Sequence, residues 1–202
     1  MPDIPSHAIT ALILTGGRAS RMGGDDKGLL DCAGRPLIEH VLARVTPCVA
    51  AVLISANRHL DRYRGYGHPV LADAAADFSG PLAGIARGLE HCPTEWLWVL
   101  PCDAPLFEAS LLTRLRDACR APGTTAAVPM EGSRMQSTFA LLHRETRASL
   151  HAYRDQGRRA VGDWLRTLPA AEVDCRDHPE WFVNLNTPAE LAACAARLED
   201  RP

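Results

Sequence analysis

The stretch A-I-T-A-L-I-L-T-G-G, which runs from Ala8 to Gly17, decides the fold class of this chain. Its first part, Ala8 to Leu14, is a short and nearly continuous apolar run that stops at two glycines. A run of this kind is typical of a strand that is buried on both faces, as strands of parallel sheets are. We therefore expect a central strand followed directly by a glycine-rich loop.

The same pattern of short apolar run and helical repeat continues along the chain. Further strands are predicted at 49–55, 69–71, 96–100, 126–129 and 139–142. Helices are predicted from Pro36, from Gly80-Pro81, from Ser110 as a cap, at 145–155, at 161–167, and from the capping box Thr187-Pro188-Ala189-Glu190. Strands that alternate with helices indicate an α/β protein with a mainly parallel sheet.

Composition narrows the class of protein. The chain has 202 residues, of which 47% are hydrophobic and 23% charged, as in an ordinary globular domain and unlike a disordered chain. A net charge of -2 offers no bulk basic field for nucleic acid, and no apolar run reaches the length of a membrane helix. The seven cysteines include no C-x-x-C pair, and the first residues show no secretory signal. We expect a cytoplasmic protein with reduced thiols and neither nucleic acid nor membrane as a partner.

Polar residues gather where the predicted strands end. Gly16, Asn57, Asp73 and Asp103 each lie just past the carboxyl end of a predicted strand. In open α/β sheets, ligands bind in the crevice outside these ends. Any one of the four could be an ordinary turn residue, but together they predict a binding site.

The loop after the first strand has the chemistry of a polyphosphate site. Gly16 and Gly17 allow the backbone to approach a ligand closely, and the cations Arg18, Arg21 and Lys27 follow within a few positions. The loop contains neither G-x-x-x-x-G-K-[ST] nor G-x-G-x-x-G, which excludes a P-loop and the dinucleotide fingerprint.

At these residues the sequence resembles a known family, the molybdenum cofactor guanylyltransferases, which are nucleotidyltransferases with a Rossmann-like fold. The resemblance rests on blocks that occur in family order: residues 14–30, Gly34-Arg35-Pro36-Leu37, Ser55-Ala56-Asn57-Arg58, Gly80-Pro81-Leu82-Ala83-Gly84, Cys102-Asp103-Ala104-Pro105 and Asn184-Leu185-Asn186-Thr187-Pro188. Two positions depart from the family pattern. Thr15 stands where the family usually has Ala, and Ser137 stands where it often has Pro.

The resemblance implies both a fold and an activity. The fold would be three-layered, with a mostly parallel central sheet and helices on both faces. One domain would span 1–202, with about 8–120 binding GTP and about 121–202 forming the molybdopterin side. The enzyme would be a Mg²⁺-dependent guanylyltransferase that transfers GMP from GTP to the terminal phosphate of molybdopterin and releases pyrophosphate. Molybdenum-insertion proteins and molybdoenzyme chaperones are further partners to expect.

Individual roles follow from residue chemistry and from the resemblance together. Asp103 follows an apolar strand and offers the hard oxygen that Mg²⁺ prefers, so it is the expected metal ligand. Arg21 and Lys27, with Asp103, are the expected catalytic residues. The expected GTP-binding residues are Leu14, Thr15, Gly16, Gly17, Lys27, Ser55, Asn57, Asp73 and Asp103. Asn184 and Asn186 are expected on the molybdopterin side, and Cys102 is expected to pack rather than react.

Several alternatives stay open at this level. Ser55, Asn57 or Asp73 could face the base. Asp25 and Asp26 could be solvated or could hold the basic loop in place. The pair Arg158-Arg159 could bind the phosphate of the second substrate or lie in solvent. A nucleotidyltransferase that uses CTP or a sugar or polyol phosphate, and a nucleotide-binding protein without turnover, are the rival functions.

Overall fold

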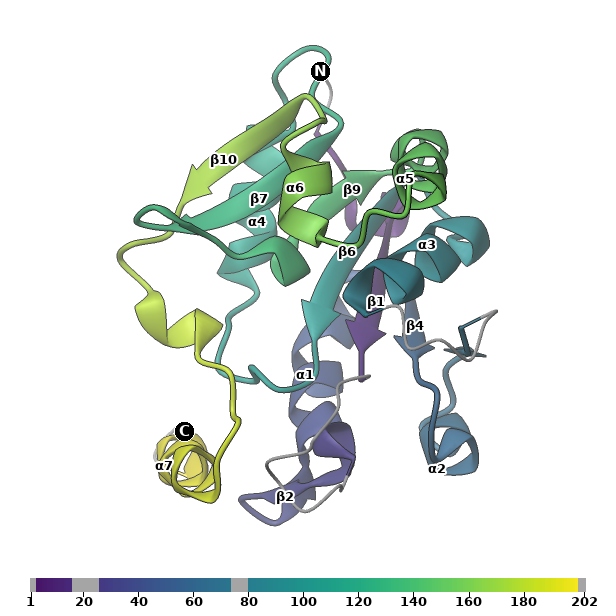
Figure 1. Ribbon diagram of the computed structural model, residues 1–202. Helices are drawn as coiled ribbons and strands as arrows, with labels where there is room; N and C mark the ends of the chain where they lie inside the picture. The colour runs from purple at the N-terminus through teal and green to yellow at the C-terminus, as the bar shows by residue number, and fades with distance from the viewer. Residues whose placement is uncertain (1–2, 16–25, 74–79, 200–202) are drawn as a thin grey trace.

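The fold follows from a computed structural model that describes residues 3–15, 26–73 and 80–199. The strands of the main sheet are β1 (Ile9–Leu14), β4 (Ala51–Ser55), β5 (Val70–Leu71), β6 (Trp96–Pro101), β7 (Ala126–Glu131), β8 (Arg134–Met135), β9 (Leu141–His143) and β10 (Ala170–Asp174). A separate hairpin pairs β2 (Asp31–Cys32) with β3 (Arg35–Pro36). The helices are α1 (Leu37–Val45), α2 (Leu60–Arg64), α3 (Pro81–His91), α4 (Ser110–Ala118), α5 (Thr146–Asp155), α6 (Val161–Leu165) and α7 (Pro188–Glu199). Figure 1 shows their arrangement.

The main sheet is mostly parallel, as predicted. Its order is β10-β7-β9-β6-β1-β4-β5, and β8 pairs with β7 outside this path. The pairs β5–β4, β4–β1 and β1–β6 are parallel, and so is β7–β10. Strand β9 is antiparallel to both of its neighbours, β6 and β7. The carboxyl ends of β1, β4 and β6 therefore meet at one edge of the sheet, at the bottom of Figure 1.

Alternation along the strands builds two cores, one on each face of the sheet. In β1, Ile9, Ala11 and Ile13 point into one cluster, and Leu12 and Leu14 point into the other. Successive side chains of a strand point to opposite faces, so a strand that is apolar at nearly every position fills both cores. The nearly continuous apolar run from Ala8 to Leu14 is explained by this double burial.

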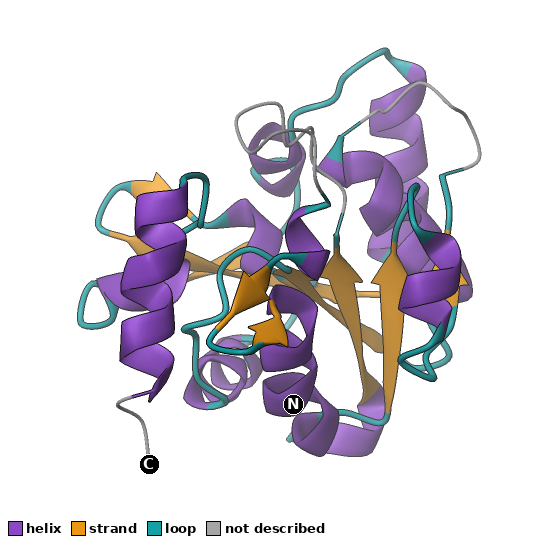
Figure 2. Ribbon diagram, turned by 90° about the horizontal axis from the view of Figure 1, so that it is seen from below, coloured by secondary structure: helices purple, strands orange, loops and turns teal. Residues whose placement is uncertain are grey.

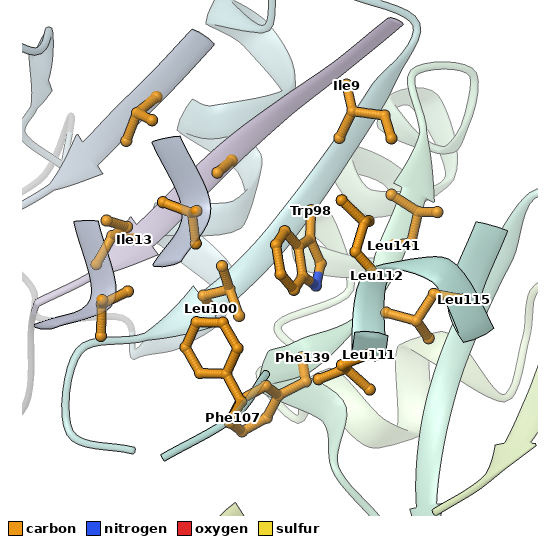
Figure 3. Packing of buried hydrophobic residues seen from close by; sticks show 14 of the residues in the cluster. Ile9, Ile13, Trp98, Leu100, Phe107, Leu111, Leu112, Leu115, Phe139 and Leu141 are labelled. Carbon is orange, nitrogen blue, oxygen red and sulfur yellow. The ribbon is translucent and has the colours of Figure 1, made fainter. Parts of the chain in front are cut away.

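Helices cover both faces and complete three layers. Figure 1 shows α3, α5 and α6 in front of the sheet and α1 and α4 behind it. The core behind the sheet is rich in aromatic side chains, and Figure 3 shows Trp98, Phe107 and Phe139 packed together there. The ring centroids of Trp98 and Phe107 lie 5.7 Å apart, in an edge-on arrangement that aromatic pairs favour.

Helix α7 lies at the same end of the molecule as the carboxyl ends of β1, β4 and β6, although it is the last element of the chain. Figure 2 looks onto this end and shows α7 beside the hairpin of β2 and β3. A small apolar cluster joins them, with Cys32 and Leu37 from the hairpin side and Leu185 and Cys194 from the C-terminal side. The C-terminal segment is thereby anchored beside the first half of the chain.

Some details differ from the sequence-based predictions. Ser110 does not cap α4: it is the first residue of the helix, Ala109 occupies the cap position, and no side chain caps there. Of the predicted strand 139–142, Phe139 belongs instead to a 3₁₀ turn, and β9 begins at Leu141. The elements β2, β3, β8, β10 and α2 were not predicted. No helix in the described part of the chain has the length and apolar character needed to cross a membrane.

Candidate functional site

The candidate site lies at the carboxyl edge of β1, β4, β5 and β6. Of the residues predicted to form it, the structure describes Leu14, Thr15, Lys27, Ser55, Asn57, Asp73, Asp103, Asn184 and Asn186. Gly16, Gly17 and Arg21 lie outside the described residues, as do Arg18 and Asp25. Several of these described residues contact one another.

Asp103 meets Lys27 at the end of β6. The Nζ atom of Lys27 donates to Oδ2 of Asp103 at 2.9 Å, and the two side chains are only 14% and 19% exposed. The backbone around Asp103 is held on both sides, because Cys102 N donates to the carbonyl of Leu14 and Leu185 N donates to the carbonyl of Asp103. The carboxylate thus stands on a rigid base with a cation already beside it.

Lys27 also reaches the far end of the chain. Its Nζ donates to Oδ1 of Asn186 at 2.6 Å. Asn186 is itself held by Glu190, whose Oε2 accepts from the backbone N–H of Asn186 at 2.7 Å and of Thr187 at 2.9 Å. Thr187 Oγ1 in turn accepts from Glu190 N at 3.2 Å, which confirms the predicted capping box. The backbone N–H of Asn186 lowers the pKa of Glu190, so this cap stays charged.

Asn57 and Asp73 form a reciprocal pair. Asn57 Nδ2 donates to Oδ2 of Asp73 at 2.7 Å, and Asp73 N donates to Oδ1 of Asn57 at 2.8 Å. These two bonds fix the orientation of the Asn57 amide. The other carboxylate oxygen of Asp73, Oδ1, is buried and receives no hydrogen bond from the described residues. A buried acceptor without a donor is costly, so Oδ1 is suited to a donor on a ligand.

Ser55 differs from the other two candidates for the base. It ends β4, is buried, and lies against α3, because a Cβ added to Gly84 would come within 2.5 Å of its Oγ. Its carbonyl accepts from both the backbone N–H and the hydroxyl of Thr15, at 3.0 and 2.9 Å. The Thr15 hydroxyl, where the family usually has Ala, thus has a structural partner.

Two further predictions concern residues outside this group. Arg159 donates to the carbonyls of Arg154 and Arg158 at 3.0 and 2.8 Å, so its guanidinium caps the end of α5. Arg158 lies over the ring of Tyr153, 4.4 Å from its centroid. Cys102 is buried, and burial raises the pKa of its thiol well above the ordinary value, which fits a packing role.

Tyr63 was not predicted from its sequence pattern, and two roles remained open for Asp26. Asp26 caps the 3₁₀ turn Lys27–Leu29: its Oδ1 accepts from Gly28 N at 3.3 Å and from the hydroxyl of Tyr63 at 2.5 Å. Asp26 therefore holds the segment that carries Lys27. Tyr63 lies in α2, a five-residue helix with too few residues to show a periodic pattern. No sequence signal connected it to the site.

Among the residues that the structure describes, the acidic, histidine and cysteine side chains do not form a closed metal site. Within residues 3–15, 26–73 and 80–199, no group of three or more His, Cys, Asp or Glu residues could hold an ion. A metal at Asp103 would therefore depend on a ligand's own oxygens and on water. Mg²⁺ is commonly bound in this way, through one or two carboxylates and substrate phosphates.

The sequence is similar to known nucleotidyltransferases over most of its length. It matches the family described as "MobA-like NTP transferase domain" over residues 11–172. A molybdenum cofactor guanylyltransferase from Ralstonia nicotianae is 43% identical, over 96% of this chain and 99% of its own length. One from Vibrio campbellii is 42% identical, over 90% of this chain and 92% of its own.

Solved structures show the same fold. The molybdopterin-guanine dinucleotide biosynthesis protein A of Archaeoglobus fulgidus superposes with a TM-score of 0.80 at 21% identity, over 95% of this chain and all of that one. The 2-C-methyl-D-erythritol 4-phosphate cytidylyltransferase of Thermus thermophilus superposes with a TM-score of 0.74 at 19% identity, over 93% and 98%. These two likenesses concern the fold alone, and they show that it does not by itself choose between guanylyl and cytidylyl transfer.

Proposed function

The chain belongs to the molybdenum cofactor guanylyltransferases, and from this premise we propose how its described residues carry out guanylyl transfer. The reaction moves GMP from GTP to the terminal phosphate of molybdopterin, which forms the guanine dinucleotide of the cofactor and releases pyrophosphate. The observation that carries the proposal is the junction of Lys27 with Asp103 and Asn186. It unites a strand end of the nucleotide half with the C-terminal segment.

The acceptor is already a nucleophile, so the site needs no strong general base. A phosphate oxygen of molybdopterin attacks the α-phosphorus of GTP, the bond to the β-phosphate oxygen breaks, and pyrophosphate leaves with the bonding electrons. The task of the protein is to position both phosphates and to balance the negative charge that develops. Lys27, a cation held 2.9 Å from Asp103, is suited to meet the triphosphate. Arg21 is proposed to add a second cation.

Asp103 is proposed as the protein ligand of a Mg²⁺ ion. Its carboxylate is a hard oxygen ligand that stays 19% exposed at the open edge of the sheet. Its Oδ2 also accepts a hydrogen bond from Nζ of Lys27, so a positive charge already lies beside this carboxylate. When bound, Mg²⁺ would supply Lewis-acid polarisation of the phosphates.

The guanine side is proposed at Asn57 and Asp73. Oδ1 of Asp73, which receives no hydrogen bond from the described part of the chain, is a charged acceptor that suits the N1–H and 2-amino donors of guanine. Adenine and cytosine present no matching pair of donors at that edge, so they would leave the acceptor unpaired. Leu14, Thr15, Gly16 and Gly17 are proposed to approach the nucleotide through backbone groups, with Ser55 beneath them.

The second substrate is proposed to lie against Asn184 and Asn186. Asn186 is exposed and next to Lys27, so a molecule held there would have its phosphate near the charges that serve the nucleotide. Molybdenum-insertion proteins and molybdoenzyme chaperones are proposed as the partners that deliver and receive the cofactor. The rival in which CTP is the donor shares the fold, but the relatives above 40% identity are named guanylyltransferases.

The decisive experiment replaces the proposed metal carboxylate. Asp103→Asn keeps the size of the side chain but removes its charge, so we expect a folded protein whose pyrophosphate release with GTP, molybdopterin and Mg²⁺ falls roughly a thousand-fold. Asp61→Asn is the matched control, because the Asp61 side chain is 96% exposed and pairs with Arg64 on the surface of α2. The control should retain full activity.

The donor nucleotide and the acceptor are tested in the same assay. Pyrophosphate release is measured with GTP, CTP and ATP, with and without molybdopterin. Comparable kcat/KM values for CTP would overturn guanylyl transfer in favour of the cytidylyl rival, and absence of turnover with tight GTP binding would favour a regulatory protein. Near wild-type activity of Asp103→Asn at saturating Mg²⁺ would remove Asp103 from the metal site.

A further inference from the structure

The hydroxyl of Tyr63 is buried at the back of the candidate site. Tyr63 is fully buried in the core behind the sheet, yet its hydroxyl donates to Oδ1 of Asp26 at 2.5 Å. It comes from α2, which follows β4 and the loop that carries Asn57. A tyrosine hydroxyl in a core needs a partner, and here that partner belongs to the segment of Lys27.

The oxygen of Asp26 that accepts from Tyr63 also builds the turn of Lys27. Asp26 Oδ1 accepts from Gly28 N at 3.3 Å and so caps the 3₁₀ turn Lys27–Leu29. Lys27 is the first residue of that turn, between the capping residue and the glycine. Two donors on one oxygen thus fix the backbone on both sides of Lys27.

Gly28 shows how closely this turn is seated. A Cβ at Gly28 would lie 2.6 Å from the hydroxyl oxygen of Tyr63 and 3.4 Å from Sγ of Cys102. No side chain fits there, so the turn rests directly on the hydroxyl of Tyr63 and on the residue before Asp103. The position of the Lys27 backbone is therefore defined relative to the strand end that carries Asp103.

The protonation of Tyr63 gives this contact a fixed direction. Burial, and next the hydrogen bond to Asp26, raise the pKa of Tyr63 far above its ordinary value. The hydroxyl is therefore protonated at neutral pH and donates to Asp26. A charged acceptor makes such a hydrogen bond strong.

We propose that Tyr63 is a positioning residue for the guanylyl transfer, which acts through Asp26 to hold Lys27 against the reacting phosphates. The inference rests on the role proposed above for Lys27. Lys27 has a long side chain, and its ammonium group can meet Asp103 and Asn186 together only if its backbone is held in place. Catalysis by charge is sensitive to such placement, because a misplacement of about 1 Å can cost on the order of a hundred-fold in rate.

The test removes only the hydroxyl. In Tyr63→Phe we expect kcat for GMP transfer to fall about ten-fold, while the KM for GTP changes less than about three-fold, because the displaced charge serves the transition state most. Asp26→Asn should show the same split, and it alters a half-exposed residue rather than the core. Tyr66→Phe is the matched control: Tyr66 is the next tyrosine of the same segment, and the carboxylate beside it is that of Glu39 rather than that of Asp26. It should retain wild-type kcat.

A double-mutant cycle distinguishes positioning from a general effect on the fold. In a Lys27→Met background, measured in single turnover with enzyme in excess, adding Tyr63→Phe should cost nothing further. The same absence of a further loss is expected in the Asp26→Asn background. Melting temperatures of all variants are recorded, since a purely structural role would lower them without such coupling.

The outcomes separate this inference from the proposal on which it rests. A ten-fold further loss from Tyr63→Phe in both backgrounds would show that Tyr63 does not act through Asp26 and Lys27. Unchanged kcat in both Tyr63→Phe and Asp26→Asn would overturn the positioning role while Lys27 keeps its own. If Lys27→Met alone left kcat unchanged, the proposed role of Lys27 would fail, and this inference would fail with it.

Discussion

At the scale of single residues, the two carboxylate oxygens of Asp73 differ in their partners. Oδ2 accepts from Asn57, whereas Oδ1 is buried and receives no donor from the described residues. The bond to Asn57 leaves the carboxylate little freedom to turn. A ligand therefore meets an acceptor that is already oriented, which is what recognition of guanine requires.

This division predicts how Asp73→Asn changes the choice of nucleotide. An amide keeps the shape of the side chain but replaces a charged acceptor, so we expect kcat/KM for GTP to fall roughly 10- to 100-fold. The value for ATP should hardly change, because adenine has no N1–H to lose. Steady-state kinetics with both nucleotides measures the ratio, with Asp61→Asn as the control. An unchanged ratio of GTP to ATP would show that Asp73 does not face the base.

The sequence predicted these residues one by one but could not show their contacts. Asp73, Asn57 and Asp103 were found because each follows an apolar strand, and the carboxyl ends of parallel strands meet at one edge. The contact between Lys27 and Asn186 joins residues 159 positions apart. It depends on how the C-terminal segment packs, and no local pattern encodes that. The role of each residue toward a ligand stays a prediction.

At the scale of elements, the sequence predicted best those strands whose own residues form a strong apolar pattern. Strands β1 and β6 are buried at every position and were found from their apolar runs. Strand β10 was missed because none of its residues is fully buried and its apolar face consists only of Ala171 and Val173, which is too short a pattern to mark a strand. Its place in the sheet comes from parallel pairing with β7, which is a tertiary interaction.

Helix α1 shows how one buried polar residue links an element to its neighbour. His40 is 1% exposed, and its Nε2 lies 2.7 Å from the carbonyl oxygen of Cys32 in β2. A guanidinium nitrogen of Arg35 lies 3.4 Å from Nδ1. A neutral ring that donates from Nε2 and accepts at Nδ1 satisfies both contacts. Burial, and next the charge of Arg35, lower the pKa of His40.

The lowered pKa makes the stability of the fold depend on pH. As the pH falls below the ordinary histidine value of about 6.5, the unfolded chain takes up a proton at His40 before the folded one does. The contribution of neutral His40 to the free energy of unfolding should therefore be fully present above about pH 6.5 and should decline as the pH falls below that value. His40→Gln should flatten part of this decline, with the remainder carried in part by His68, whose pKa is also lowered by burial.

Urea unfolding at several pH values between 5 and 8 provides the measurement. The expected difference between wild type and His40→Gln is one of slope, in addition to any constant offset from altered packing. Equal slopes would mean that His40 takes up its proton at the same pH in the folded and unfolded states. His7→Gln is a suitable control, because His7 is exposed.

At the scale of the whole molecule, the nucleotide half and the C-terminal segment meet at one lysine. Asn57 and Asp73 form the nucleotide side of the site, and Asn184 and Asn186 form its C-terminal side. Lys27 contacts Asn186 on the C-terminal side and is paired with Asp103. The candidate site thus has two walls, which come from distant parts of the chain. Two substrates that must react with each other can be held separately on such walls.

This arrangement predicts opposite effects for two alanine substitutions. Asn186→Ala should raise the KM for molybdopterin more than that for GTP, because an asparagine side chain can both donate to and accept from the amide-like edge of a pterin. Asn57→Ala should do the reverse. Titration of each substrate against both variants, together with steady-state kinetics, gives the comparison. A loss of GTP affinity in Asn186→Ala that equals or exceeds the loss for molybdopterin would exclude this segment as the pterin wall.

The antiparallel strand β9 has a consequence for how the chain folds while the ribosome synthesises it. It bonds β6 on one side and β7 on the other, so it closes the sheet between the two halves. About 40 residues must be made between Pro101, the end of β6, and Leu141, the start of β9. At roughly 5–20 residues per second this interval lasts about 2 to 8 seconds. During this interval the apolar strand W-L-W-V-L-P has an unpaired edge. A nascent chain in that state can pair through this edge with other nascent chains on the same mRNA.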